Sequence, residues 1–529
     1  MPTEHSPDSP ALHPGTPVGV IGAGAMGAGI AQLAAQAGHP VWLFDMQAGA
    51  AERAVARIGD DLAGAVRRGK LTDAERDAVL ARLAPAAALS DLSACGLLVE
   101  AIVERLEPKQ ALFKDLEALV APHAVLATNT SSISITAVAQ ALQHPERVVG
   151  WHFFNPATRM KLVEIIPGLR TNPALLAPLR ALSKAWGKVP VAAPNAPGFI
   201  VNRVARPYYA EALRLASEGL ASFATLDRLM REAGGFALGP FELMDLIGND
   251  VNLAVTESVF QATAFDSRYA PSLLQQERVR AGLLGRKSGQ GFHDYRPEAV
   301  AAAANVVMPP LHLAANHTLA CAPDLLAAAS GAGLAHPLAA LLLRLQATGA
   351  VLVPDAEVPA GMFTLGEALV GLTDGRTATD CALQHQRPVL LLDLALDYAS
   401  TTTLGATSSQ PDGAGLDALA GLLALANIAL LGLVDVAGLG VMRTVACLAN
   451  EAADVMTWTG TTAADIDTGM RLGTAYPRGP LAWADSLGAI RIVQVLTHLH
   501  QHYGDARYRR APRLTRAALT GQALHPVAA

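Results

Sequence analysis

Residues 18–27 read Val18-Gly19-Val20-Ile21-Gly22-Ala23-Gly24-Ala25-Met26-Gly27, an apolar run that leads into the glycine pattern G-x-G-x-x-G. The residues that follow are small and apolar, as expected for a helix packed closely on a sheet. In a strand–loop–helix unit Gly22 allows the tight turn, and Gly24 lets a diphosphate approach the backbone. Gly27 lets the helix pack closely on the strand. The segment predicts a dinucleotide site, the alternative being a tightly packed turn without a ligand.

Asp45 ends the next apolar run, residues 41–44. A carboxylate at that position can accept hydrogen bonds from both ribose hydroxyls of a dinucleotide. It would repel the 2′-phosphate of NADP. The expected cofactor is therefore NAD.

Apolar runs separated by helical spans continue to about residue 190, and they include Leu97–Val103, Val125–Thr128 and Val148–Phe153. This alternation predicts a parallel sheet with helices on both faces, a doubly wound α/β (Rossmann) domain over residues 18–192. Residues 1–17 are expected to be a disordered lead. Residues 193–300 have a helical pattern, with helices expected at Ile200–Glu218, Thr225–Ala233 and Leu243–Gln261.

Residues 301–414 are expected to form a degenerate α/β region, with buried strands at Ala350–Val353 and Val389–Leu392. Gly331-Ala332-Gly333 is a partial glycine signature, with His336 at the third glycine position. Thr401–Gly415 is rich in Ser, Thr and Gly and is expected to be a linker. Residues 415–529 are expected to form a second, non-catalytic helical domain.

The second helical domain repeats the first at a fixed offset of 240 residues, which places Arg203 on Arg443 and Glu211 on Glu451. Several polar positions coincide at this offset. Further pairs are Asp227 with Asp467, Gly239-Pro240 with Gly479-Pro480, Asp245 with Asp485, and Leu176–Asn195 with Leu416–Asp435. One helical domain packed on the other would imitate a dimer interface within one chain, and further homo-oligomers remain open.

Composition excludes several classes of partner. The chain has 529 residues, 51% hydrophobic and 16% charged, with a net charge of −6. This charge gives no reason to expect nucleic acid or a membrane surface as a partner. The four cysteines are scattered, so neither a metal site nor a disulfide framework is expected. The apolar stretch Ala418–Val434 has a soluble counterpart in the repeat, and no secretory signal is visible, so a cytoplasmic protein is expected.

Trp151-His152-Phe153-Phe154-Asn155-Pro156 places a histidine at the end of a predicted strand, where doubly wound sheets bind ligands. Glu164 follows 12 residues later inside an apolar run. A strand–turn–strand path could return this acid to His152. A His–Glu pair suits a general base, because the carboxylate stabilises the imidazolium as it forms. The alternative is a satisfied core histidine with an edge-facing glutamate.

Asn129-Thr130-Ser131-Ser132 follows another strand at the same edge, where short polar side chains can hold a hydroxyl or a nicotinamide. Ordinary capping of the next helix is the alternative. Asn202 is a polar residue at an otherwise apolar helix start, and it could be a cap or a substrate contact.

These segments together resemble the L-3-hydroxyacyl-CoA dehydrogenase family. The resemblance spans Val18 to about Tyr295, and its helical half recurs near Gly415–Pro512. The long form is similar to bacterial 3-hydroxyacyl-CoA and 3-hydroxyadipyl-CoA dehydrogenases. The motifs are the glycine loop, Glu100-Ala-Ile-Val-Glu104, Asn129-Thr-Ser-Ser132, His152-Phe-Phe-Asn-Pro156, Pro197-Gly-Phe-Ile-Val-Asn-Arg203 and Gly285-Arg-Lys-Ser-Gly-Gln-Gly-Phe292.

The resemblance implies that His152 is the base and that Glu164 orients it. Ser131 and Asn202 would position the substrate's C3 oxygen and thioester, with Asn155 as a further substrate contact. The implied cofactor residues are Gly22, Gly24, Met26, Gly27, Asp45, Glu104, Lys109, Asn129 and Lys287. Arg67, Arg68 and Lys70 could meet the CoA phosphates, but a solvated basic helix end is the favoured interpretation.

The implied activity is NAD-dependent oxidation of an (S)-3-hydroxyacyl-CoA to the 3-oxoacyl-CoA. The expected substrate is 3-hydroxyadipyl-CoA or a short-chain thioester, in aromatic (phenylacetate) catabolism or fatty acid β-oxidation. Two alternatives stay open: an NAD-binding structural protein of the same family, and another two-domain NAD-dependent hydroxyacid dehydrogenase. The presence of both His152 and Glu164 argues against the first. The segment His152–Pro156 argues against the second, whose members use a lysine or cysteine base.

Overall fold

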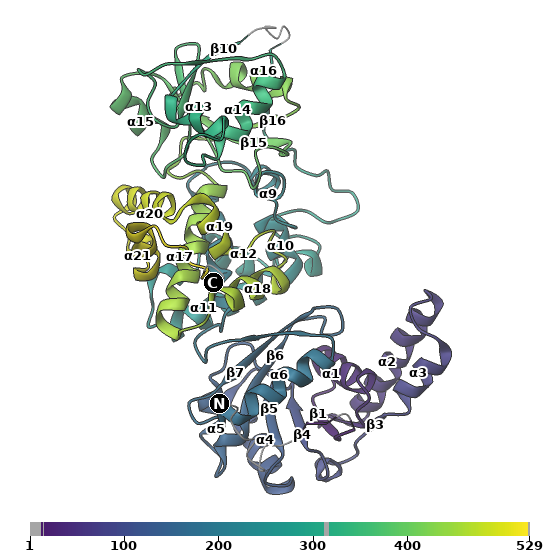
Figure 1. The fold of residues 1–529 in the computed structure, drawn as a ribbon. Helices are drawn as coiled ribbons and strands as arrows, with labels where there is room; N and C mark the ends of the chain where they lie inside the picture. Colours follow the sequence, from purple (N-terminus) through teal and green to yellow (C-terminus); the bar gives the residue numbers. More distant parts are fainter. Residues whose placement is uncertain (1–11, 14, 311–316, 527–529) are drawn as a thin grey trace. The chain divides into compact units, whose positions relative to one another are not determined.

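The computed structural model describes residues 12–13, 15–310 and 317–526 (Figure 1). Most of the predicted lead at residues 1–17 lies outside the described residues. The chain divides into two compact units, Met1–Arg203 with Ala464–Thr474, and Val204–Ala463 with Ala475–Ala529.

The first unit is built on one eight-stranded sheet, and its predicted strands are confirmed, except that the strand expected at Leu97–Val103 ends at Glu100. All neighbouring strands are parallel except β6 and β7. In spatial order the strands are β3 (Leu83–Pro85), β2 (Val41–Phe44), β1 (Val18–Ile21), β4 (Leu97–Glu100), β5 (Val125–Thr128), β6 (Val148–Phe153), β7 (Leu162–Pro167) and β8 (Val189–Ala192).

Successive side chains of each strand point to opposite faces of the sheet, and their contacts show which helices cover which face. Val18 and Val20 join one buried cluster with four helices, whereas a side chain at Gly19 would meet Leu92 on the opposite face. The four helices are α1 (Ala25–Gln36), α2 (Ala50–Arg67), α3 (Asp73–Leu80) and α6 (Leu176–Ala185). Helices α4 (Leu106–Leu119) and α5 (Ile135–Ala139) bury Phe113 and Ile135 outside that cluster. The sheet is therefore covered on both faces, as a doubly wound domain requires.

The second unit contains a second, mixed eight-stranded sheet, so the expected α/β region is confirmed. Its strands, in spatial order, are β11 (Val351–Pro354), β10 (Thr318–Cys321), β12 (Met362–Leu365), β13 (Ala368–Leu372), β14 (Val389–Leu392), β15 (Thr403–Ser408), β16 (Ala429–Gly432) and β9 (Val306–Val307). The helices next to it in sequence are α13 (Pro323–Ala329), α14 (Leu338–Ala347), α15 (Ala378–His385) and α16 (Leu416–Leu425).

The predicted linker and the predicted domain boundary at residue 415 are wrong. The predicted linker Thr401–Gly415 contains β15, a fully buried strand of the sheet. Because β16 pairs with β15, the sheet extends past the predicted boundary at residue 415. Gly331-Ala332-Gly333 follows helix α13, so this pattern does not join a strand to a helix as a phosphate-binding loop does.

The helical repeat is confirmed, except that two helices at the start of the first copy correspond to one continuous helix in the second. Helix α10 begins at Pro240 and α19 begins at Pro480. The first copy contains α7 (Val201–Val204), α8 (Arg206–Ser217), α9 (Phe223–Glu232), α10 (Pro240–Ile247), α11 (Asn249–Ala262) and α12 (Leu273–Arg280). The second contains α17 (Val441–Thr459), α18 (Ala463–Gly473), α19 (Pro480–Leu487), α20 (Ala489–Tyr503) and α21 (Pro512–Thr520).

The single helix expected at Leu243–Gln261 is wrong. Gly248 has φ +100° and separates α10 from α11, and Gly488 does the same in the second copy with φ +85°. Glycine adopts these angles without the steric cost that a Cβ would impose. The repeat therefore preserves the break as well as the helices.

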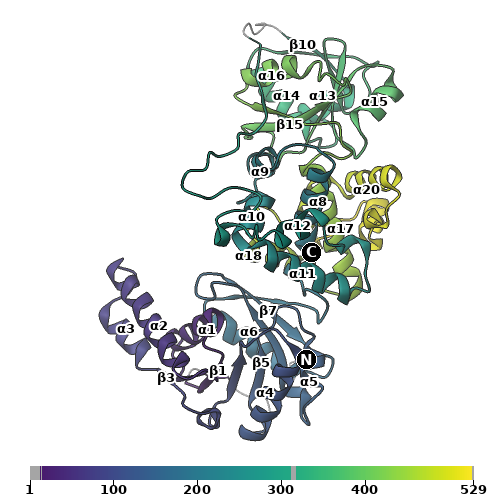
Figure 2. The same cartoon turned by 180° about the vertical axis from the view of Figure 1, so that it is seen from behind.

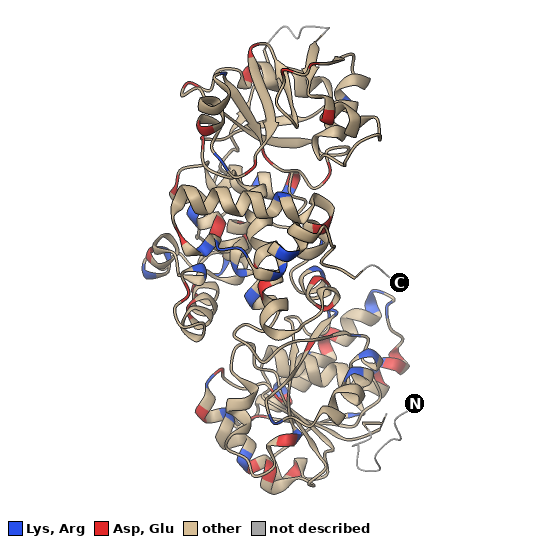
Figure 3. Ribbon diagram, turned by 60° about the vertical axis from the view of Figure 1, so that its left-hand side comes forward, with Lys and Arg blue, Asp and Glu red and all other residues tan. Residues whose placement is uncertain are grey.

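Helices of the two copies pack together inside the second unit, where α8 and α17 lie side by side (Figure 2). Arg443 of α17 is fully buried and bonds Glu211 at 2.8 Å and Glu218 at 2.8 Å. Arg268 makes the reverse connection, to Glu451 and Asp454 at 3.0 Å each. Figure 3 shows Lys and Arg segments gathered among these helices. Buried ion pairs across the contact fix the register of one copy against the other.

Candidate active site

The glycine loop has the geometry expected of a diphosphate-binding turn. Gly22 has φ +106°, and a Cβ there would lie 2.4 Å from the carbonyl oxygen of Ala101. A Cβ on Gly27 would lie 1.7 Å from the carbonyl oxygen of Gly22. A Cβ on Gly24 would meet nothing within 4 Å, so its missing side chain leaves open space at the start of α1. Unpaired N–H groups at a helix start favour phosphate.

Backbone N–H groups, one of them in the glycine loop, fix the orientation of the Asp45 carboxylate. Its Oδ2 accepts the N–H of Ala23 at 2.7 Å, and its Oδ1 accepts the N–H of Gln47 at 2.9 Å. A cavity of about 620 Å³ runs beside the loop, lined by Gly22, Gly24 and Asp45 together with apolar groups such as Ile102. An open glycine, an oriented carboxylate and an apolar cavity fit the dinucleotide that the sequence predicts.

A buried acid–base network supports the next loop. Lys109 is only 1% exposed, and its ammonium lies 2.6 Å from Glu100 Oε1 and 3.3 Å from Glu104 Oε2. The hydroxyl of Thr128 donates to the other Glu100 oxygen at 2.6 Å. Two carboxylates therefore enclose the charge of Lys109, which holds Glu104 in place. That Lys109 also lines the cofactor stays a prediction.

Glu104 in turn fixes the backbone of residues 130–132. Its Oε1 accepts from the Thr130 hydroxyl at 2.8 Å and from the Ser131 N–H at 2.8 Å. Burial alone would raise the pKa of the Glu104 carboxyl, but Lys109 and the Thr130 hydroxyl outweigh it and lower the pKa. Glu104 is therefore a stable anion that shapes the loop carrying Ser131.

His152 and Glu164 lie together as the sequence predicts. They are direct partners in the antiparallel ladder of β6 and β7, with Nδ1 of His152 2.7 Å from Oε2 of Glu164. The other carboxylate oxygen, Oε1, accepts the N–H groups of Ile200 and Val201 at 3.1 Å each. His152 is 6% exposed and Glu164 is 1% exposed. Glu164 thus has a fixed orientation, and it fixes the ring of His152.

Asn129, Ser131 and Asn202 are also placed in the first unit. The side-chain oxygen of Asn129 accepts the N–H of Phe153 at 2.8 Å, which ties the residue 129–132 loop to the strand that carries His152. The amide nitrogen of Asn202 approaches the carbonyl oxygen of Ser131 at 3.4 Å. These contacts gather the predicted substrate-positioning groups at the carboxyl edge of β5 and β6.

The remaining predicted residues are less closely connected to this edge. Asn155 is exposed and lines a second cavity of about 610 Å³ beside α1 and α2. Lys287 belongs to the second unit, where it lies 2.5 Å from Asp250. Arg67 and Arg68 lie at the C-terminal end of α2, and Lys70 follows them. None of these three lines either cavity beside the glycine loop.

Sequence reasoning missed four groups that shape the site. Glu100 acts through Lys109, and the N–H groups of Ile200 and Val201 act through Glu164. These contacts give no recognisable pattern in the sequence. Arg57 lines the second cavity and donates to the carbonyl oxygen of Ala23 at 3.0 Å. Its spacing along α2 could have been noticed, because it shares a helix face with Arg53 four residues earlier.

A glycine loop, an oriented acid and a His–Glu pair on one doubly wound sheet define an NAD-dependent oxidoreductase. The family model for the 3-hydroxyacyl-CoA dehydrogenase NAD-binding domain matches residues 17–196. The model for that family's C-terminal domain matches residues 198–295 and again 438–524. A 3-hydroxybutyryl-CoA dehydrogenase reduced Rossmann-fold domain matches residues 370–436. The chain belongs to the 3-hydroxyacyl-CoA dehydrogenase family, NAD-dependent oxidoreductases that act on a CH–OH group.

Relatives support this assignment over nearly the whole chain. A 3-hydroxyadipyl-CoA dehydrogenase from Escherichia coli is 42% identical over 95% of this chain and 97% of its own length. A solved structure of 3-hydroxybutyryl-CoA dehydrogenase from the same organism has TM-score 0.85 and 40% identity, covering 96% of this chain and 99% of that one. A human mitochondrial hydroxyacyl-coenzyme A dehydrogenase is 39% identical over 53% of this chain and 91% of its own length.

No group of three or more His, Cys, Asp or Glu side chains in the described part of the chain could hold a metal ion. No helix there is both long and apolar enough to cross a membrane.

Proposed function

We propose that this chain oxidises the 3-hydroxyl of an (S)-3-hydroxyacyl-CoA to the 3-oxoacyl-CoA, with His152 as the general base. The observation that carries the proposal is the 2.7 Å contact between His152 Nδ1 and Glu164, next to the loop of Asn129 and Ser131. That pair lies in the same sheet as the glycine loop, whose geometry fits NAD.

The proposed chemistry follows from the ring's orientation. Glu164 accepts from Nδ1–H, so Nε2 is the nitrogen left to receive the proton of the substrate hydroxyl. As the O–H bond breaks, the C3–H bond gives up its electron pair and the C3 carbonyl forms. NAD, when bound, supplies the acceptor for that hydride. Glu164 then stabilises the imidazolium, and Ser131 and Asn202 orient the oxygen on C3.

The acyl group is proposed as short or carrying a distal carboxylate. Support comes from the names of the relatives, one acting on 3-hydroxyadipyl-CoA and others on 3-hydroxybutyryl-CoA. These substrates suit aromatic (phenylacetate) or fatty acid catabolism in the cytoplasm. The two arginines Arg53 and Arg57, which line the cavity beside Asn155, are suitable partners for CoA phosphates.

The second helical copy is proposed to replace a dimer partner. Its support is the packing of α17 on α8, with Arg443 and Arg268 each reaching carboxylates of the other copy. Such a contact within one chain leaves other surfaces open for further assembly.

The test is NADH formation by the purified chain with 3-hydroxybutyryl-, 3-hydroxyhexanoyl- and 3-hydroxyadipyl-CoA, compared by kcat/KM. NADH consumption with acetoacetyl-CoA measures the reverse reaction. His152→Ala is the matched inactive control. A chain that binds NADH but turns over none of these thioesters would contradict the proposal.

A further inference from the structure

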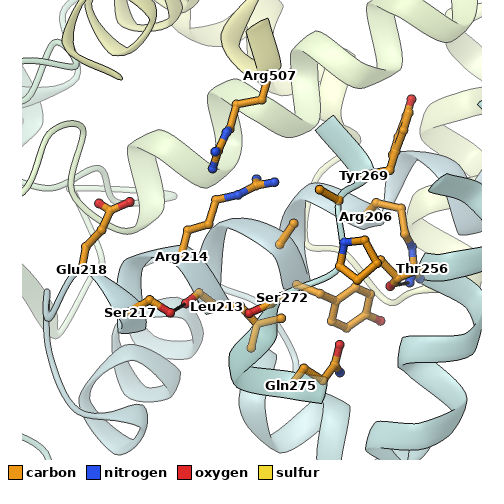
Figure 4. Close-up of a pocket in the computed structure, with 14 residues that line it drawn as sticks. Arg206, Leu213, Arg214, Ser217, Glu218, Thr256, Tyr269, Ser272, Gln275 and Arg507 are labelled. Atoms are coloured by element: carbon orange, nitrogen blue, oxygen red, sulfur yellow. Dashed lines mark hydrogen bonds between the residues drawn. The ribbon is translucent and has the colours of Figure 1, made fainter. Parts of the chain in front are cut away.

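A cavity of about 310 Å³ lies among the helices of the second unit, lined by α8, α11, the start of α12 and Arg507 (Figure 4). Three arginines line it, Arg206, Arg214 and Arg507, with Glu218 as the acid. Tyr209, Leu213 and Pro271 form apolar parts of its wall. Every lining residue belongs to the second unit, so the cavity is separate from the dinucleotide loop and from His152.

The internal repeat supplies a comparison for Arg507. Short turns Ser267–Tyr269 and Ala506–Tyr508 correspond in the two copies at an offset of 239 residues, one less than in the helices before them. Each is capped by an aspartate that accepts the arginine N–H. Arg268, the arginine of the first turn, is only 6% exposed and bonds two carboxylates of α17, Glu451 and Asp454. Two carboxylates of the second copy therefore balance the positive charge of Arg268.

The residues of the first copy that correspond to these two carboxylates are different. At the offset of 240 residues, the counterparts of Glu451 and Asp454 on α8 are Glu211 and Arg214. One carboxylate is therefore kept and the other is replaced by a guanidinium. Glu211 already accepts from Arg214 at 2.5 Å and from Arg443 at 2.8 Å.

The result is a cavity whose lining side chains carry three guanidinium groups and one carboxylate. Arg507 ion-pairs with Asp505 of its own turn, is 26% exposed and has a buried Nε with no protein partner among the described residues. Figure 4 shows Arg507 and Arg214 extending towards one another across the cavity. Guanidinium groups that line one cavity repel each other, and the penalty grows as water is excluded.

We propose that this cavity binds a small organic anion, with a carboxylate or phosphate group between Arg214 and Arg507. Planar guanidinium groups suit both oxyanions, because each can donate two parallel hydrogen bonds. The apolar body of the ligand would rest on Tyr209, Leu213 and Pro271. Since Arg214 belongs to the first copy and Arg507 to the second, the ligand would link the two copies. The proposal does not depend on the chemistry assigned to His152.

Calorimetric titration of the full chain with succinate and with glycerol 3-phosphate tests the site and separates the two sources of oxyanion. We expect at least one of them to bind with a stoichiometry near one per chain. Arg507→Gln should weaken that binding about tenfold or more, as expected for a lost charge-assisted hydrogen bond. Arg280→Gln removes the same charge from an exposed position and should leave binding unchanged.

Arg214→Gln tests the other guanidinium, and its amide can still donate a hydrogen bond to Glu211. This variant should weaken anion binding while keeping a cooperative thermal transition. The proposal is overturned if neither anion binds the wild type, or if Arg507→Gln and Arg214→Gln bind as well as Arg280→Gln does.

Discussion

Asp393 occupies in the second sheet the position that His152 occupies in the first. His152 faces Glu164 across the β6–β7 ladder, and Glu164 lies beside Val191 of β8. Asp393 directly follows β14 and donates its N–H to Gly405 of β15, and Gly405 lies beside Leu431 of β16. The second sheet thus keeps the frame of the first site with an aspartate and a glycine in place of the histidine and glutamate.

Asp393 also takes over the structural part of the role of Glu164. Glu164 binds the N–H groups of Ile200 and Val201, and Asp393 binds those of their counterparts Gly440 and Val441 at 2.9 and 2.8 Å. The carboxylate therefore anchors the start of α17. The second sheet thus keeps a carboxylate that anchors the start of a helix, but it has no histidine at this place that could act as a base.

Asp393→Asn should change how stability depends on pH. Burial raises the pKa of Asp393 from 3.8 to about 6, although four backbone N–H donors lower it. The folded state therefore holds the proton more tightly, and this contribution is present below pH 3.8 and lost as pH rises through about 6. Asparagine does not titrate, so the variant should gain stability relative to wild type with rising pH, by at most about 3 kcal/mol. Thermal midpoints at about pH 5 and about pH 8 measure it, and a constant offset between the two proteins would contradict it.

His152→Ala should lower kcat by about 10²–10⁴-fold and leave NADH affinity unchanged, because the ring serves proton transfer and not the dinucleotide. Glu164→Gln should be impaired less. A glutamine can still accept from Ile200 and Val201, but an amide that donates to His152 would favour the wrong tautomer. Stopped-flow turnover and fluorescence titration with NADH give the two readouts. Near wild-type activity in His152→Ala would remove the proposed base.

Asp45→Ala should narrow the preference for NAD over NADP. Ala23 and Gln47 aim the carboxylate from the backbone, so its loss should cost about 10–100-fold in kcat/KM for NAD, the value of charge-assisted hydrogen bonds to ribose. The removed charge should at the same time improve NADP. Asp60→Asn, an exposed acid of the same domain, is the control. Equal specificity constants for both cofactors in the wild type would remove the role given to Asp45.

Much of the first unit could be predicted because its signals are local. The glycine loop and Asp45 follow apolar strands, and the strand–turn–strand path was enough to return Glu164 to His152. What failed depends on tertiary partners. Strand β15 is rich in Thr, Ser and Gly, yet Thr403 is buried because its hydroxyl donates to Glu232 at 2.5 Å. Lys109 could not be recognised as buried, since only the turn between β4 and α4 brings the carboxylates of Glu100 and Glu104 to its ammonium.

Gly473→Val, a change in helix α18 of the second copy, should impair catalysis in the first unit. Residues 464–474 of that copy belong to the first unit, and a Cβ on Gly473 would lie 2.9 Å from Leu162 and 3.0 Å from Val201. Val201 supplies one of the N–H groups that hold Glu164, so displacing it should loosen the orientation of His152. We expect a fall in kcat with little change in NADH affinity. Gly59→Ala is the control, because a Cβ there is no closer than 3.8 Å to its neighbours and helix propensity improves.

The duplicated architecture raises the question of how many dinucleotides one chain binds. In the second half Met442 stands where Asn202 stands in the first, and it is fully buried. A thioether cannot donate a hydrogen bond to a substrate oxygen. Asp393 and Gly405 replace the base and its partner, and the glycines at 331–333 follow a helix. None of the elements that make the first unit a site recurs in working form in the described part of the second.

We therefore predict one NADH per chain, measured by calorimetric titration. Gly24→Asp makes the test decisive. Gly24 has φ −67° and open space where a Cβ would lie, so an aspartate should fold normally there while its charge occupies the expected diphosphate position. The variant should bind no NADH and keep the wild-type thermal midpoint, whereas Gly24→Ala should bind more weakly but measurably. A second site would appear as a wild-type stoichiometry near two, and as one equivalent that survives in Gly24→Asp. Either result would mean that the second sheet binds a dinucleotide without a glycine loop, and Asp393 would then have to be reconsidered as part of a site.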